Sequence, residues 1–134
     1  MNKQNFINVS FFLLRVVAGL MLVQAGGMKI LGWFGGVPMH PLPLLLTVGG
    51  LIELVGGAAI MLGLFTNIVA FILSGEMAVA YFMGHVATSG HMLVPSLNQG
   101  IPAVLLCFIF LFLSAYGSGE WGLDSWLKKR KTLV

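Results

Sequence analysis

The sequence predicts an all-α membrane protein, a single domain over residues 1–134 built as a four-transmembrane-helix bundle with both termini cytoplasmic. Hydrophobic residues make up 58% of the chain, charged residues only 8%, and the mean hydropathy is +0.99. An average soluble domain is about a quarter charged. The apolar runs are continuous rather than alternating, which favours helices over the strands of a β-barrel. We therefore expect a multi-pass protein of the cell inner membrane.

Four apolar stretches are the predicted spans. They cover Phe6 to Ala25, Leu42 to Leu64, Ile68 to Val86, and Ile101 to Tyr116. A helix over the second stretch would be about 33 Å long, close to a hydrocarbon core of about 30 Å. The fourth stretch is only just long enough to cross.

The connections between these stretches differ in kind. Residues 26–41 and 87–100 are rich in Gly and Pro and predict longer loops. Leu64 to Asn67 leaves room only for a tight turn, so the second and third helices are predicted to form an antiparallel hairpin.

The distribution of basic residues predicts the orientation. Lys3 precedes the first stretch and Lys128 to Lys131 follow the last, which places both termini in the cytoplasm. A cleaved signal sequence is the alternative for the first stretch, but Arg15 within the apolar region argues against it. The basic run lies beside Trp121 and Trp126, a composition typical of an interfacial anchor on the lipid bilayer rather than of nucleic-acid binding.

Three ionisable residues near the middle of separate spans are the first candidates for function: Arg15, Glu53 and Glu76. A lone charge in the bilayer costs roughly 2.5–3.5 kcal/mol, so such residues normally pair inside the bundle. We expect the three to meet at one depth. Two carboxylates against one guanidinium leave an excess negative charge, so either one carboxyl is protonated or another cation joins them. A purely structural clamp that fixes helix register is the alternative.

Glycines surround Glu53 at helical spacing. Gly49, Glu53 and Gly56 share one face, with Gly50 and Gly57 beside them. Small residues let a neighbouring backbone approach closely in a membrane. Glu53 is therefore predicted to lie in a groove where helices pack, and Gly19 on the first helix is expected to act similarly.

A second polar cluster is expected at the end of the bundle opposite the termini. Its members are Gln24, Lys29, His40, His85, His91 and Asn98. A metal site is one reading, but no two of the histidines have the one-turn spacing of a helical ligand pair. In a regular α-helix His85 would also point away from Glu76. We expect no metal here and interpret the cluster as interfacial hydrogen bonding.

Several runs together resemble the DoxX family of small four-helix membrane proteins. They are Arg15 to Gly19, Gly26 to Lys29, Glu53 with Gly56 and Gly57, Leu62 to Leu64, Ala80 to Met83 with His85, Pro95 with Asn98, and Gly117, Gly119, Trp121, Leu123 and Asp124. The resemblance covers nearly the whole chain. Each run is weak alone, since Gly and Leu are common in membrane helices, but their order and spacing are fairly specific.

The chain departs from the family pattern at two places. After Asn98 the family often has two glycines and a glutamate, where this chain has Gln99, Gly100 and Ile101. The turn after the second helix often has Arg, where this chain has Asn67. The family name comes from a subunit associated with quinone-linked sulfur oxidation, so the resemblance implies a membrane redox role.

A small subunit of a quinone-linked oxidoreductase is the first functional hypothesis. Arg15, Glu53 and Glu76 would be its catalytic groups, and Gln24, Lys29, His85 and Asn98 would bind the substrate. A protonated carboxyl beside an arginine would donate to a quinone carbonyl and stabilise developing charge. The sequence has one cysteine, Cys107, and no haem, flavin or iron–sulfur motif. No intrinsic cofactor is therefore expected, and in this hypothesis a quinone binds to the protein and receives electrons from a redox partner protein.

Two hypotheses from other classes stay open. One is a non-catalytic membrane assembly or helper protein, for which glycine-lined helices provide docking surfaces. The other is a small transporter or proton pathway, motivated by charges at mid-membrane depth. Four helices leave little room for a substrate path, so that function would require a homo-oligomer.

Overall fold

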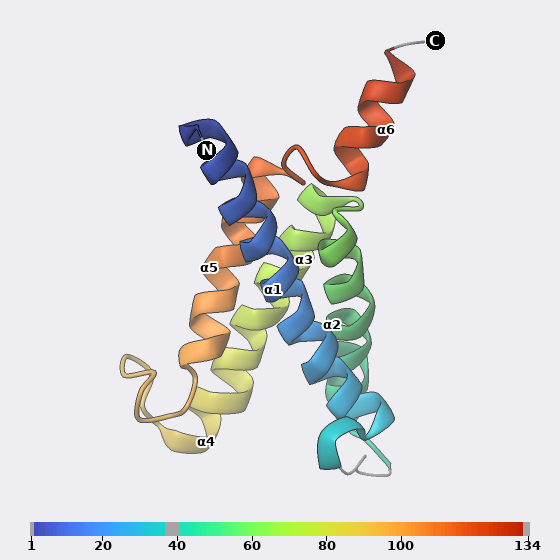
Figure 1. Cartoon of the computed structure of the whole chain (residues 1–134). Coiled ribbons are helices and arrows are strands. Elements are labelled where there is room, and N and C mark those ends of the chain that lie inside the picture. Colours follow the sequence, from blue (N-terminus) through green and yellow to red (C-terminus); the bar gives the residue numbers. More distant parts are fainter. Residues whose placement is uncertain (1, 37–40, 133–134) are drawn as a thin grey trace.

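The computed structural model describes residues 2–36 and 41–132, and these residues form helices without any strand (Figure 1). The predicted all-α class is thus confirmed. The elements are α1 (Lys3–Leu31), the 3-10 turn η1 (Trp33–Gly35), α2 (Leu44–Leu62), α3 (Thr66–Val79), the π-helical η2 (Ala80–Val86), α4 (Ala87–Ser89), α5 (Ile101–Tyr116) and α6 (Leu123–Lys131). His40 of the predicted polar cluster lies outside the described residues.

Three helical segments are long and apolar enough to cross a membrane: Lys3–Leu31, Leu44–Leu62 and Thr66–Ser89. The fourth apolar helix, α5, begins and ends at the predicted residues. Its 16 residues span only about 24 Å, less than a hydrocarbon core of about 30 Å. The four apolar helices are confirmed, and crossing by α5 stays a prediction.

The helix ends follow local signals. Proline precedes α2 at Pro43, and Gly32 and Gly63 end α1 and α2 in the left-handed conformation, with φ of 69° and 70°. Helix α1 is longer than predicted, since Gly26 and Gly27 continue it rather than break it. Both glycines are buried against neighbouring groups, so packing offsets their low helix propensity.

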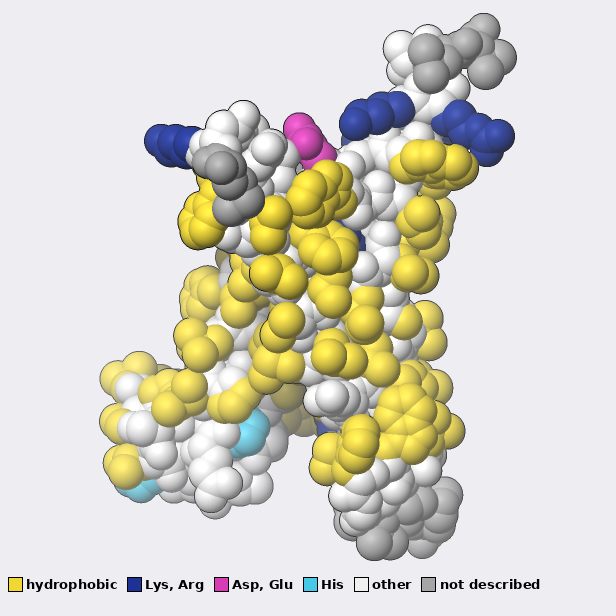
Figure 2. Space-filling view, viewed as in Figure 1, with side chains coloured by type: hydrophobic (Ala, Val, Ile, Leu, Met, Phe, Trp, Pro, Cys, Tyr) yellow, Lys and Arg dark blue, Asp and Glu magenta, His cyan; other side chains and the backbone are white. Residues whose placement is uncertain are grey.

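All four long helices contribute to one core, although α1 lies mainly along α2 and α3 along α5 (Figure 1). The buried core side chains are Ala18 and Leu22 of α1, Ile60 of α2, Ala70, Leu73 and Met77 of α3, and Leu106, Phe110 and Leu113 of α5. Large hydrophobic side chains such as Val55, Phe71 and Phe108 are exposed by 64–67%. Figure 2 shows that such side chains cover the flank of the bundle, as expected for a surface in contact with lipid.

The bundle has two distinct ends. Helix α1 starts and α6 lies at one end, which we name the terminal end, while η1 and α4 lie at the opposite end (Figure 1). Basic side chains gather at the terminal end in Figure 2.

Glycine contacts hold α1 and α2 close together, as the sequence predicts. A methyl group on Gly19 would lie 2.7 Å from the carbonyl oxygen of Gly57, and one on Gly26 would lie 2.5 Å from that of Gly50. These backbones approach so closely that only a hydrogen fits between them. The same contacts fix the axial register of the two helices.

We expect Gly57→Ala to destabilise the protein by about 1–3 kcal/mol, because the added methyl would meet both Gly19 and Val23 backbone atoms. Gly75→Ala is the matched control, since no atom lies within 4 Å of a methyl group there. Alanine favours a helix over glycine, so this variant should gain about 0.5–1 kcal/mol. Thermal unfolding in one detergent compares them, and equal midpoints would refute the close packing of α1 on α2.

The terminal segment folds back onto the hairpin turn between α2 and α3. The Asp124 carboxylate accepts hydrogen bonds from the backbone N–H groups of Phe65 and Thr66, both at 2.8 Å. The Asp124 N–H in turn donates to the Gly63 carbonyl at 2.9 Å. Asp124 thus caps the start of α3 from far away in sequence. No local sequence pattern predicts this role of Asp124, and the one signal in the sequence is its place in the resemblance to the family.

Candidate functional site

The prediction that Arg15 meets Glu53 and Glu76 is wrong, because the Arg15 side chain binds backbone carbonyls elsewhere. The Arg15 guanidinium is buried and donates to the carbonyl oxygens of Ile60 at 2.6 Å and Met61 at 2.8 Å. It also donates to the Trp121 carbonyl at 3.1 Å. Arg15 therefore binds the last carbonyls of α2 and ties the terminal segment to them, a structural role.

The register of α1 against α2 explains this correction. Gly19 lies opposite Gly57 and Gly26 lies opposite Gly50 and Leu54. The part of α1 level with Glu53 is therefore near residues 23–27, at least eight residues beyond Arg15. That offset is about 12 Å along the helix axis, too far for a guanidinium to bridge.

Lys29 is the cation that joins the glutamates. Its Nζ lies 2.5 Å from Oε1 of Glu53, and the Glu53 side chain is only 3% exposed. Lys29 is in the last turn of α1, and its long side chain reaches to the middle of α2. Lys29 takes the place predicted for Arg15 instead of joining it as a second cation, so two carboxyl groups still share one cation and the excess negative charge predicted from the sequence remains.

Glu76 belongs to the same group of charges. It is half-buried on α3, near enough to Glu53 and Lys29 for both charges to act on it. Its Oε1 lies against Gly49, where a methyl group would be 3.4 Å away. The second oxygens of Glu53 and Glu76 are both buried and have no hydrogen-bond partner among the described residues. Each is free to bind a donor.

A cavity of about 470 Å³ lies beside these groups, between α2 and the segment formed by α3 and η2. Its polar lining is Lys29, Glu76 and His85, with apolar side chains such as Leu46, Ile52, Ile72, Val79 and Met83 around them. Figure 2 shows a notch between two lobes at the end of the molecule opposite the terminal end. This lining is typical of a small-molecule site, because it is mostly apolar and has a few polar groups gathered at one place.

The π-helical segment η2 brings His85 to this cavity. In a regular α-helix His85 would point opposite to Glu76, because nine residues turn the helix by two and a half revolutions. In η2 the hydrogen bonds run from i to i+5, so each residue turns less than in an α-helix. His85 and Glu76 consequently line one cavity. Nothing in the sequence pattern predicted the change in pitch.

Gln24 and Asn98, two predicted binding residues, are not part of this lining. Gln24 is exposed on α1. Asn98 is buried and organises the loop before α5: its amide nitrogen donates to the His91 carbonyl at 2.8 Å, and its Oδ1 accepts from the Gly100 N–H at 2.8 Å. The Asn98 carbonyl oxygen lies 3.0 Å from Nδ1 of His85. Asn98 therefore positions His85 and does not face the cavity.

Comparison with known proteins identifies the family. The DoxX family model matches residues 10–86. The chain belongs to the DoxX family. An uncharacterized protein of Haemophilus influenzae is 42% identical to it over 116 residues, which cover 84% of this chain and 86% of that relative. No solved structure matches it.

The part of this DoxX-family protein that matches the family model runs from α1 to η2. It contains Lys29, Glu53, Glu76 and His85, and therefore every polar group that we assign to the cavity and its ion pair. It also contains Arg15. In the described residues, no group of three His, Cys, Asp or Glu side chains is placed to hold a metal ion.

Proposed function

We propose that this DoxX-family membrane protein is a small subunit of a quinone-linked redox system and that a quinone binds in the cavity between α2 and α3–η2. The observation that carries the proposal is Glu76, whose buried Oε2 has no partner at the polar end of an apolar cavity. A quinone has the matching form, a ring with two carbonyl acceptors and an apolar tail.

The lining suits that ligand in size and chemistry. The volume of about 470 Å³ lies in the usual range of small-molecule sites. Lys29 and a protonated Glu76 are hydrogen-bond donors for one carbonyl, while Leu46, Ile52 and Ile72 provide an apolar wall. The tail would leave through the open side of the cavity into the bilayer.

Proton delivery is the chemical role that we assign to the glutamates. Reduction of a quinone to a quinol takes up two electrons and two protons. Glu76 would give the first proton to the carbonyl oxygen nearest to it, the second proton would reach the other carbonyl oxygen from water at this end of the bundle, and the Lys29 ammonium would stabilise the charge that develops at the first oxygen. The electrons would come from the redox group of a partner protein in the same membrane.

The proposal includes the placement in the membrane. We infer four crossings in the cell inner membrane with the terminal end in the cytoplasm, on the distribution of Lys3 and Lys128 to Lys131. The cavity would then lie toward the other face of the membrane.

The test is a titration of the purified protein with a short-chain ubiquinone analogue, followed by calorimetry. We expect saturable binding to the unmodified protein and a weakening of about 10-fold in Glu76→Gln, because an amide N–H is a weaker hydrogen-bond donor to the quinone carbonyl than a carboxylic acid O–H. Glu120→Gln is the matched control. It removes the same charge at the terminal end, where Glu120 accepts a hydrogen bond from Asn8, and should bind as the unmodified protein does.

Three results would contradict the proposal. One is no binding of the analogue. Another is equal binding by Glu76→Gln and the unmodified protein. The third is proton flux into liposomes that disappears in Glu76→Gln, because that would identify a proton pathway instead.

A further inference from the structure

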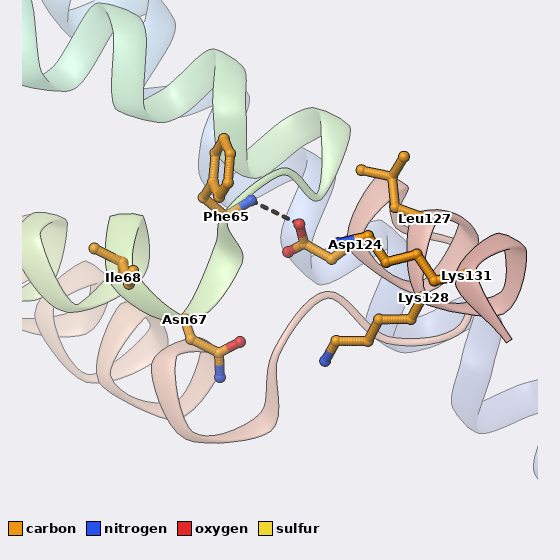
Figure 3. A pocket seen from close by; sticks show the side chains of 7 residues that line it. All are labelled: Phe65, Asn67, Ile68, Asp124, Leu127, Lys128 and Lys131. Carbon is orange, nitrogen blue, oxygen red and sulfur yellow. Dashed lines mark hydrogen bonds between the residues drawn. The ribbon is translucent and has the colours of Figure 1, made fainter.

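A separate pocket of about 280 Å³ lies at the terminal end, between α6 and the turn that joins α2 to α3 (Figure 3). It is lined by Phe65, Asn67 and Ile68 from the turn and the start of α3, and by Asp124, Leu127, Lys128 and Lys131 from α6. It shares no residue with the cavity beside Glu76.

The two walls of this pocket are fixed to each other. Figure 3 shows Asp124 reaching from α6 to the backbone of Phe65, and its two oxygens accept hydrogen bonds from the N–H groups of Phe65 and Thr66. The carboxylate is thus occupied by the backbone. Lys128 and Lys131 follow on the same helix, three residues apart, so both line the pocket on one face of α6.

The charge in this pocket is not balanced. The described residues contain one ion pair, that of Lys29 with Glu53, and it involves neither Lys128 nor Lys131. Asp124 is the one acidic side chain of the lining, and it also serves as the cap of α3. Both lysines line this one pocket, and two ammonium groups there attract an anion with more than one oxygen, such as a phosphate group.

The apolar part of the lining distinguishes a lipid from a free anion. Phe65 and Ile68 are each 66% exposed, and Leu127 is 42% exposed. Phe71, one turn further along α3, is also 66% exposed and continues the apolar surface toward the middle of the bundle. An inorganic anion would leave this apolar surface exposed, whereas acyl chains would cover it.

We propose that this pocket binds an anionic phospholipid, with its phosphate between Lys128 and Lys131 and its acyl chains along Phe65 and Ile68. The lipid would hold the terminal end of the bundle at the headgroup layer. This site is distinct from a general attraction of a basic tail to the membrane surface, because it depends on which two of the four consecutive basic residues are present.

Native mass spectrometry of the full chain in detergent, with equal amounts of phosphatidylglycerol or phosphatidylcholine added, tests the site. We expect retention of phosphatidylglycerol over phosphatidylcholine. In Lys128→Ala/Lys131→Ala the phosphate loses two charge-assisted hydrogen bonds, so we expect a loss of about 30-fold in phosphatidylglycerol affinity, about fivefold for each. The matched control is Lys129→Ala/Arg130→Ala, which removes the same charge. Neither residue lines the pocket, and the Arg130 guanidinium lies 5.1 Å over the Trp126 ring. This control should lose only a few-fold.

Equal losses in the two double variants would overturn the site and leave diffuse surface attraction. Equal retention of the two lipids would also overturn it. Competition by millimolar inorganic phosphate with full loss of the lipid would identify a free-anion site instead. Quinone binding at the opposite end should be unchanged in both double variants, so the failure of either proposal leaves the other intact.

Discussion

Replacing Lys29 with methionine is expected to destabilise the folded protein by about 3 kcal/mol. Glu53 would then be a buried carboxylate without its cation, since its side chain is 3% exposed and Oε1 has Lys29 as its partner. A buried charge that loses its partner is strongly destabilising, more so than the loss of the pair as a whole. Thermal and denaturant unfolding in one detergent measure the effect.

A double-mutant cycle measures the interaction energy between Lys29 and Glu53 separately from the effect of each single substitution. Lys29→Met/Glu53→Gln removes both charges, so we expect it to be more stable than Lys29→Met alone. The two single losses should therefore not add. Strict additivity would mean that the ion pair contributes nothing in the membrane-like environment, and the site geometry at Glu53 would have to be abandoned.

Replacing Arg15 with methionine is expected to cost about 3 kcal/mol through a different mechanism. The guanidinium donates to three carbonyl oxygens, those of Ile60, Met61 and Trp121. Its loss leaves the Ile60 carbonyl with the Gly63 N–H alone, removes the side-chain donor of the Met61 carbonyl, and detaches the segment around Trp121. Hydrogen exchange over residues 121–126 should become faster, because the Asp124 N–H is held by Gly63 in the intact protein.

Arg15→Lys is the control for charge alone. A single ammonium keeps the charge but cannot reach three carbonyls at once, so an intermediate stability is expected. Quinone affinity per folded molecule should be unchanged in both Arg15 variants. If Arg15→Met weakened quinone binding as much as Glu76→Gln, with no faster exchange at the terminal segment, Arg15 would belong to the site after all.

These two predictions treat as separate the residues that the sequence analysis grouped together. Equal depth of Arg15, Glu53 and Glu76 was inferred from their positions within apolar stretches. Position within a stretch does not give the offset between neighbouring helices, because α1 runs from Lys3 to Leu31 and extends well past the end of α2. The glycine contacts set that offset, and they bring Lys29 rather than Arg15 to Glu53.

His85 shows a second limit of the same kind. Its direction was deduced from regular helical rotation, and the change to π-helical pitch over Ala80–Val86 altered it. Asp124 shows a third, since its partners Phe65 and Thr66 lie about 60 residues away and no local pattern links them.

The composition of this chain and the spacing of its apolar and glycine residues were enough to predict helices, the bounds of α5, the tight turn after α2 and the glycine face of α2. The reason is that a chain in lipid must satisfy its backbone hydrogen bonds locally, so composition and spacing carry that information. Which charges meet was fixed by contacts between helices far apart in sequence: the axial offset of α1 on α2, the pitch of η2 and the return of Asp124 to the hairpin turn. Close packing of backbones and side chains sets those three features, and a single sequence does not encode them in any local pattern.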